Sequence, residues 1–152
     1  MAAGDVVFFD QFLVDVMEGL HDLENDTIKV AYITSAVTPL ATTTDPRWGA
    51  GGTTNFSSNE VTPGGNYSTG GPSAANPSVT LSGGAAVFDA DDISITQNAS
   101  NPTNARWGII YNDTATGKNC IGFVDNGSAV DMSAGDFSNA WNASGIASLD
   151  QA

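Results

Sequence analysis

The sequence predicts a single mainly β domain of the α+β class, an antiparallel β-sandwich or β-barrel-like fold with one N-terminal amphipathic helix and long Gly/Ser/Thr-rich loops. Three observations support this prediction. Apolar residues recur at helical spacing in about 5–24, loop-forming residues crowd about 35–84, and short apolar runs separated by turn residues fill about 85–150. A chain of 152 residues has the length of one domain, so residues 1–152 are expected to fold without a disulfide or metal.

The N-terminal helix is predicted from apolar residues that lie three or four positions apart. On a helical wheel they cover one arc of roughly 140 degrees, and they are Phe9, Phe12, Leu13, Val16, Met17, Leu20 and Leu23. Asp15 and His21 fall on the opposite, polar side, so His21 is expected at the surface. Val7 and Val14 fall off the apolar arc. They are interpreted either as a second face for contact between subunits or as isolated exposed valines.

Strands are predicted on both sides of the long central segment. The stretch TIKVAYIT at 27–34 combines alternation with β-branched residues and is expected to be the first strand. The segment 85–97 has two apolar ends around the acidic stretch DADD, which favours a bend or bulge between two strands. The segment 35–84 is expected to form long, partly ordered loops with one or two short strands. Loops of this length are usually retained for a function.

A hairpin is predicted within 105–126, where two apolar runs flank a short polar stretch. Both runs are apolar on both faces, which indicates strands buried between two layers. Simple alternation places Trp107, Ile109 and Tyr111 opposite Ile110, and Ile121 and Phe123 opposite Cys120 and Val124. We therefore expect the hairpin at the centre of the sheet, with the helix over one face. The single cysteine, Cys120, is interpreted as a small buried apolar residue rather than a reactive thiol.

Charge is strongly asymmetric, with 17 acidic residues against four basic ones and a formal net charge of -13. Such a surface is repelled by phosphate backbones and anionic membranes, so neither nucleic acid nor a membrane is expected as a partner. The N-terminal stretch lacks the basic leading region of a signal peptide. We expect the chain to stay where it is made until it is assembled.

The motifs in the sequence predict no enzyme activity, no cofactor and no metal site. His21 is expected on a solvated face, where a general base would lack a cleft. The acids at 89–92 lack the spacing of a calcium loop and are interpreted as a solvated strand edge. Trp48, Trp107 and Trp141 could form a sugar-binding platform, although Trp107 is expected in the core.

The two ends of the chain resemble a family of small virion structural proteins of tailed bacteriophages. The resemblance lies in FDQFLVDVMEGLHDLENDTIKVAYIT and in YNDTATGKNCIGFVDNGSAVDMSAGDFSNAWNASGIASL, with its Gly-Asp-x-x-x-x-Trp ending. It implies a capsid decoration or cement protein, made in the host cytoplasm, that binds the major capsid protein on the outer surface of the head as a homotrimer. A tail tube or tail-completion protein and a host- or carbohydrate-binding virion module remain alternatives.

Candidate assembly contacts are expected in two places. The first is the N-terminal segment 1–9, including Val7 and Phe8, together with Val14. The second is the loop that carries Arg47, Trp48 and Phe56. The alternative for Trp48 and Phe56 is that both rings fold back onto their own sheet. The central segment lies outside the resemblance, so the contacts in that segment rest on residue type alone.

Overall fold

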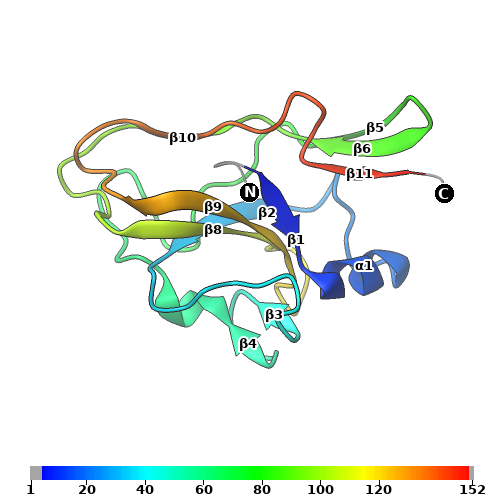
Figure 1. Cartoon of the computed structure of the whole chain (residues 1–152), viewed down its shortest axis with the longest axis horizontal. Coiled ribbons are helices and arrows are strands. Elements are labelled where there is room, and N and C mark those ends of the chain that lie inside the picture. Colours follow the sequence, from blue (N-terminus) through cyan, green and yellow to red (C-terminus); the bar gives the residue numbers. More distant parts are fainter. Residues whose placement is uncertain (1–4, 151–152) are drawn as a thin grey trace.

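The computed structural model describes residues 5–150 and has the mainly β, α+β fold that the sequence predicts (Figure 1). Its largest sheet contains four antiparallel strands in the order β1-β9-β8-β2. These strands span Val6–Phe8 (β1), Ile28–Ile33 (β2), Ala105–Asn112 (β8) and Cys120–Val130 (β9). The hairpin β8–β9 lies at the centre of the sheet, as predicted from its two apolar faces.

Smaller elements pack on the two faces of this main sheet. The strands β5, β6, β10 and β11 lie above it in Figure 1, β3 and β4 lie below it, and α1 follows β1 at one end of the sheet. Sheet β11-β6-β5 and pair β10-β7 are antiparallel, and β3-β4 is parallel. The bounds are Asp10–Met17 (α1), Pro46–Arg47 (β3), Thr54–Asn55 (β4), Phe56–Asn59 (3-10 helix), Ser78–Ser82 (β5), Ala85–Asp89 (β6), Ile93–Ile95 (β7), Phe137–Asn139 (β10) and Ala147–Leu149 (β11).

The first core lies between the main sheet and the C-terminal strands. Tyr32 and Ile110 of the main sheet pack there against Phe88, Ile95 and Phe137 of the smaller sheets. The rings of Tyr32 and Phe137 meet edge to face, with centroids 4.9 Å apart. The acidic stretch between β6 and β7 lets the chain pass from one small sheet to the other, which agrees with the bend that the sequence predicts.

The second core lies on the opposite face and is covered by the long central segment. Trp107, Ile109 and Phe123 of the hairpin are buried there beneath Trp48 and Phe56. A bulge in β9 sends Ile121 to the first core while Phe123 joins the second. The predicted pairing of those two residues on one face is therefore wrong, because an extra residue in a strand reverses the alternation beyond it.

The central segment also protects the outer edge of β2. The Val30 N–H donates to the Pro72 carbonyl at 3.0 Å, and the Ala74 N–H donates to the Ile28 carbonyl at 2.8 Å. Further along, the Tyr32 N–H donates to the Tyr67 hydroxyl at 3.0 Å. The segment therefore follows β2 as an irregular strand, which satisfies edge groups that would otherwise be available to other chains.

The helix is shorter than the sequence predicts. Residues Val6–Phe8 form β1 and pair with β9, so these three residues are extended rather than helical. The helix ends at Met17, and Gly19 then adopts a φ of +72°, which reverses the chain. The prediction of a helix over about 5–24 was wrong at both ends, because pairing with the central hairpin overrides the helical periodicity of the first residues.

We predict that Gly71→Ala destabilises the fold strongly. A Cβ at Gly71 would lie 2.0 Å from the Val30 carbonyl oxygen, and its φ of +72° also disfavours a side chain. Strain and overpacking together are expected to lower the free energy of unfolding by about 3 kcal/mol or more. Gly83→Ala is the matched control, since Gly83 has a φ of +60° but nothing within 4 Å. Urea denaturation of both variants measures the difference, and equal losses would contradict close packing at Gly71.

Candidate assembly surface

Helix α1 is seated on the body of the protein through a polar residue, Asp15, as well as through the apolar Phe12. Asp15 is buried, and its carboxylate accepts hydrogen bonds from the Asn119 amide at 2.6 Å and from the Gln11 amide at 2.8 Å. Asn119 lies in the turn between β8 and β9, so this contact fixes the helix to the central hairpin. Because a buried carboxylate needs such donors, Asp15 helps to set the rotation of the helix, together with Phe12, which is buried in the first core, and Val16, which packs against that core.

His21 is buried next to this seat, which corrects the prediction that it lies at the surface. Its side chain has no exposed area, and its Nε2 lies 3.8 Å from Asp15 Oδ2 without a hydrogen-bond partner. Its Nδ1 lies 3.2 Å from the Asn112 amide nitrogen. Burial lowers the pKa of His21 below its ordinary value, although the nearby carboxylates of Asp15 and Asp26 oppose that shift. The imidazole is therefore held inside the chain between Asp15, Asn112 and the Phe12 ring.

Arg47 belongs to the same polar cluster. Its Nη1 donates to the Asn119 side-chain oxygen at 2.6 Å and its Nε donates to Asp45 at 2.7 Å. The guanidinium is therefore hydrogen-bonded within the chain. It connects Asp45, next to β3, with Asn119, which also donates to Asp15. This arrangement gives Arg47 a role in fixing the central loop.

The rotated helix leaves an apolar stripe at the surface. Leu13 is 60% exposed and Met17 is 86% exposed, and these two residues are one helical turn apart. Val14 is exposed in the same helix, and Leu20, which follows the helix beyond the reversal at Gly19, is exposed as well. We name these four residues the helix stripe. The sequence placed Leu13, Met17 and Leu20 in the buried arc, and the structure places them in solvent.

Acidic residues surround the helix stripe. Asp10 precedes it at the start of α1, and Glu18, Asp22 and Glu24 follow it, all of them exposed. An apolar strip with an acidic border fits a partner that has an apolar depression and basic residues beside it. This pattern does not fit a nucleic acid, because phosphates would face carboxylates.

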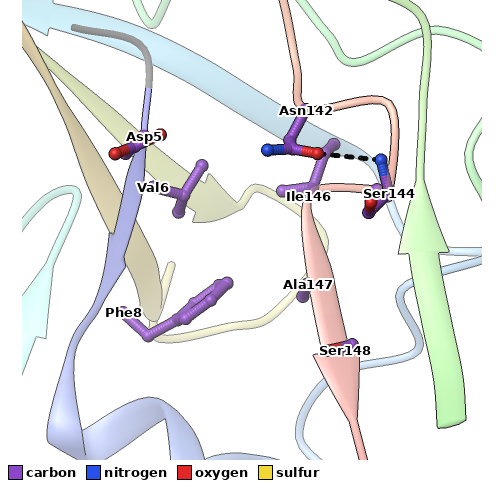
Figure 2. Close-up of a pocket in the computed structure, with 9 residues that line it drawn as sticks. Asp5, Val6, Phe8, Asn142, Ser144, Ile146, Ala147 and Ser148 are labelled. Carbon is purple, nitrogen blue, oxygen red and sulfur yellow. Dashed lines mark hydrogen bonds between the residues drawn. The ribbon is translucent and has the colours of Figure 1, made fainter. Parts of the chain in front are cut away.

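A groove lies near the helix, between β1 and the segment that leads into β11 (Figure 2). It has a volume of about 470 Å³ and is open to solvent. Val6 and Phe8 line it from β1, and Ile146 and Ala147 line it from the opposite side. Asn142 shapes the far wall through its side-chain oxygen, which accepts from the Ser144 N–H at 2.9 Å. Asp5, Ser144 and Ser148 also line the groove, so its wall is both polar and apolar.

The predicted assembly contacts fall into buried and accessible groups. Trp48 stacks on Tyr111 with centroids 5.1 Å apart, and Phe56 stacks on Phe9. Both rings are buried and so do not reach a partner, which is the fold-back alternative. Val7 and Phe8 are half-buried in β1, and Val14 is exposed in the helix stripe. The part of the predicted contact segment at 1–4 lies outside the described residues.

A second hollow lies beside Trp48. Glu60 is the one acid among its lining residues, and it accepts from the Tyr67 hydroxyl at 2.9 Å and from the Gly70 N–H at 2.6 Å. One face of the Trp48 ring is covered by Tyr111. A sugar platform built from the three tryptophans is excluded, because Trp48 and Trp107 are both buried.

The acidic stretch at 89–92 accepts hydrogen bonds from two other loops. Asp92 accepts from the Trp141 N–H at 2.9 Å, and Asp91 accepts from the Asn76 amide at 2.7 Å. Across residues 5–150, no group of three or more His, Cys, Asp and Glu side chains has the arrangement of a metal site. Cys120 is buried, and burial raises the pKa of its thiol, which keeps it protonated and unreactive.

No family model, curated protein or solved structure matches the chain. In the part of the chain that the structure describes, no helix has the length and apolarity needed to cross a membrane.

We predict that Asp15→Ala destabilises the protein by about 3 kcal/mol, since it removes a charged acceptor from two amide donors, each such bond contributing about 1.5–3 kcal/mol. Asp10→Ala is the control, because Asp10 is an exposed acid in the first turn of the same helix. Its loss is expected to be below about 1 kcal/mol. Thermal and urea unfolding measure both variants, and similar losses would show that Asp15 does not fix the helix.

We also predict that His21 makes stability fall in mild acid. The pKa of His21 in the folded protein lies below the ordinary value of 6.5, so below pH 6.5 the unfolded chain binds the proton first. The free energy of unfolding therefore decreases as the pH falls from 6.5 towards the lower, folded pKa. Urea denaturation at pH 7.5 and pH 5.0, with His21→Gln as reference, isolates this effect from the many carboxylates. Parallel pH profiles for the two proteins would contradict it.

Proposed function

We propose that the chain is a non-enzymatic virion structural protein, a decoration or cement protein that binds the outer surface of a phage head and stabilises the shell by contact. The family resemblance of the two ends of the sequence suggests the setting. The observation that carries the proposal is the helix stripe: an apolar helix face left in solvent on a strongly acidic chain. A surface of this kind is typical of a protein that is completed by a partner.

The charge distribution supports a position on the outside of a shell. With a net charge of -13, the chain would be repelled by packaged DNA at close range. The acidic border of the helix stripe is complementary to a basic rim on a capsid subunit. The major capsid protein is therefore the proposed partner, and the helix stripe is the proposed point of contact.

The internal packing supports a mechanical role. Both faces of the central hairpin are covered by cores, and the long central segment is fixed by stacked aromatic rings and by hydrogen bonds along β2. A body of this kind changes shape little on binding, so contact energy is available to hold neighbouring capsid subunits together. Three copies around a three-fold position would add avidity to modest single contacts.

We predict that Met17→Glu weakens binding to head shells at least tenfold. The substitution places a charge in the centre of the helix stripe, at a residue that is 86% exposed and therefore makes few contacts within the chain. Leu40→Glu is the matched control, since Leu40 is also a large, exposed apolar residue but lies outside the helix stripe. Cosedimentation with shells that lack the protein measures both affinities, with circular dichroism as a check of folding.

Parallel binding assays with tails, host cells and glycans separate the alternatives. Binding to purified tails but not to heads would replace the proposal with a tail tube or tail-completion role. Binding to host cells or glycans through a site that is unaffected by Met17→Glu would favour a host- or carbohydrate-binding module. Equal binding of the two Glu variants to heads would remove the helix stripe from the contact.

A further inference from the structure

Strand β5 is an exposed and uncharged sheet edge. It lies at the end of the sheet order β11-β6-β5 and, among residues 5–150, pairs only with β6. Its sequence is Ser-Val-Thr-Leu-Ser, and Leu81 is 82% exposed. In Figure 1 the strand projects from the body of the molecule next to β6. Edge strands in proteins usually carry a lysine, a proline or a bulge that prevents pairing with another chain, and β5 has none of these between 78 and 82.

The edge of β5 is uncovered, whereas the edge of β2 in the main sheet is covered. There, the central segment covers the edge of β2 through backbone hydrogen bonds such as Val30 N–H to the Pro72 carbonyl. No such segment runs along β5 in the described part of the chain, where the four residues from Val79 to Ser82 are all exposed. The chain therefore protects one edge with a long loop and leaves β5 available.

The sequence of β5 is nearly self-complementary. Apolar residues flank Thr80, and a serine closes each end. If two copies pair antiparallel about Thr80, then Val79 of one copy lies opposite Leu81 of the other, and the serines lie opposite each other. Directly opposed side chains lie on the same face of a sheet. Each exposed Leu81 would thus gain an apolar neighbour, and the inner face that contains Phe88 would continue across both copies.

The charge pattern favours a second copy as the occupant of this edge. Residues 61–88 contain no Asp, Glu, Lys or Arg, although the whole chain has a net charge of -13. Two copies of such an acidic protein repel each other over most of their surfaces. Contact is least opposed where the surface is neutral, and β5 lies within that neutral segment. A basic partner would instead be attracted to the acidic parts of the chain.

We propose that β5 pairs antiparallel with β5 of a second copy about a two-fold axis at Thr80, joining two three-stranded sheets into one continuous sheet. A contact of five residues per copy is small, so it is weak in dilute solution and becomes significant at high concentration or when the copies are already held close together. The inference concerns the chain itself and does not depend on the proposed capsid partner. On a shell, this contact would link neighbouring groups of the protein.

Cysteine cross-linking tests the two-fold pairing. Thr80→Cys would place two thiols directly opposite each other, at a Cα separation that a disulfide can span. The native Cys120 does not compete, because it is buried. Ser128→Cys is the matched control, since Ser128 is an exposed residue of β9. Under mild oxidation at equal concentration, Thr80→Cys is expected to form covalent dimers at least tenfold faster than Ser128→Cys.

A mixing experiment tests the register. Val79→Cys mixed with Leu81→Cys is expected to give the mixed dimer, distinguished by a tag, in preference to either homodimer. Adding Leu81→Lys to Thr80→Cys is expected to reduce cross-linking. Each copy would then bring one lysine into the contact, and the two positive charges would repel each other. Equal rates for Thr80→Cys and Ser128→Cys, or cross-linking of Val79→Cys to Ser148→Cys in β11, would overturn the proposal. All of these measurements use the free protein, so their failure is distinct from a failure to bind heads.

Discussion

The fold depends on one constraint: the central hairpin β8–β9 is apolar on both faces, so it must be covered twice. The C-terminal strands cover one face, with Phe88 and Phe137 packed against Ile110. The central segment covers the other face with Trp48 and Phe56. This requirement explains why a segment so rich in Gly, Ser and Thr is ordered, since Trp48 and Phe56 close the second core and Tyr67 packs into the first.

The helix shows how burial within the chain creates a surface for assembly. Asp15 is held by Asn119 at the turn of the hairpin, and His21 is buried beside it. With Asp15 and Phe12 both facing inward, Leu13 and Met17 are left in solvent. The cost of exposing them is recovered if a partner covers them, which connects the internal hydrogen bonds to the proposed function.

The sequence predicted the fold class, the first strand and the central hairpin, because alternation, β-branched residues and turn residues are local signals. It did not predict the rotation of the helix, since Asp15 and Asn119 are 104 positions apart and their contact leaves no local pattern. The bulge at Ile121 and the conversion of Val6–Phe8 into a strand depend on pairing between distant segments and were missed for the same reason. The sequence therefore predicts that the residues of the helix stripe are apolar, but only the structure shows that they are exposed.

We propose that the chain acts by contact, with its helix stripe against a shell. Electron cryomicroscopy of intact particles, at a resolution that shows subunits, tests this most directly. The account predicts density for this fold on the outside of the head at three-fold positions, with α1 facing the major capsid protein. Density along the tail or at its tip, or a head-bound subunit with α1 facing solvent, would contradict it.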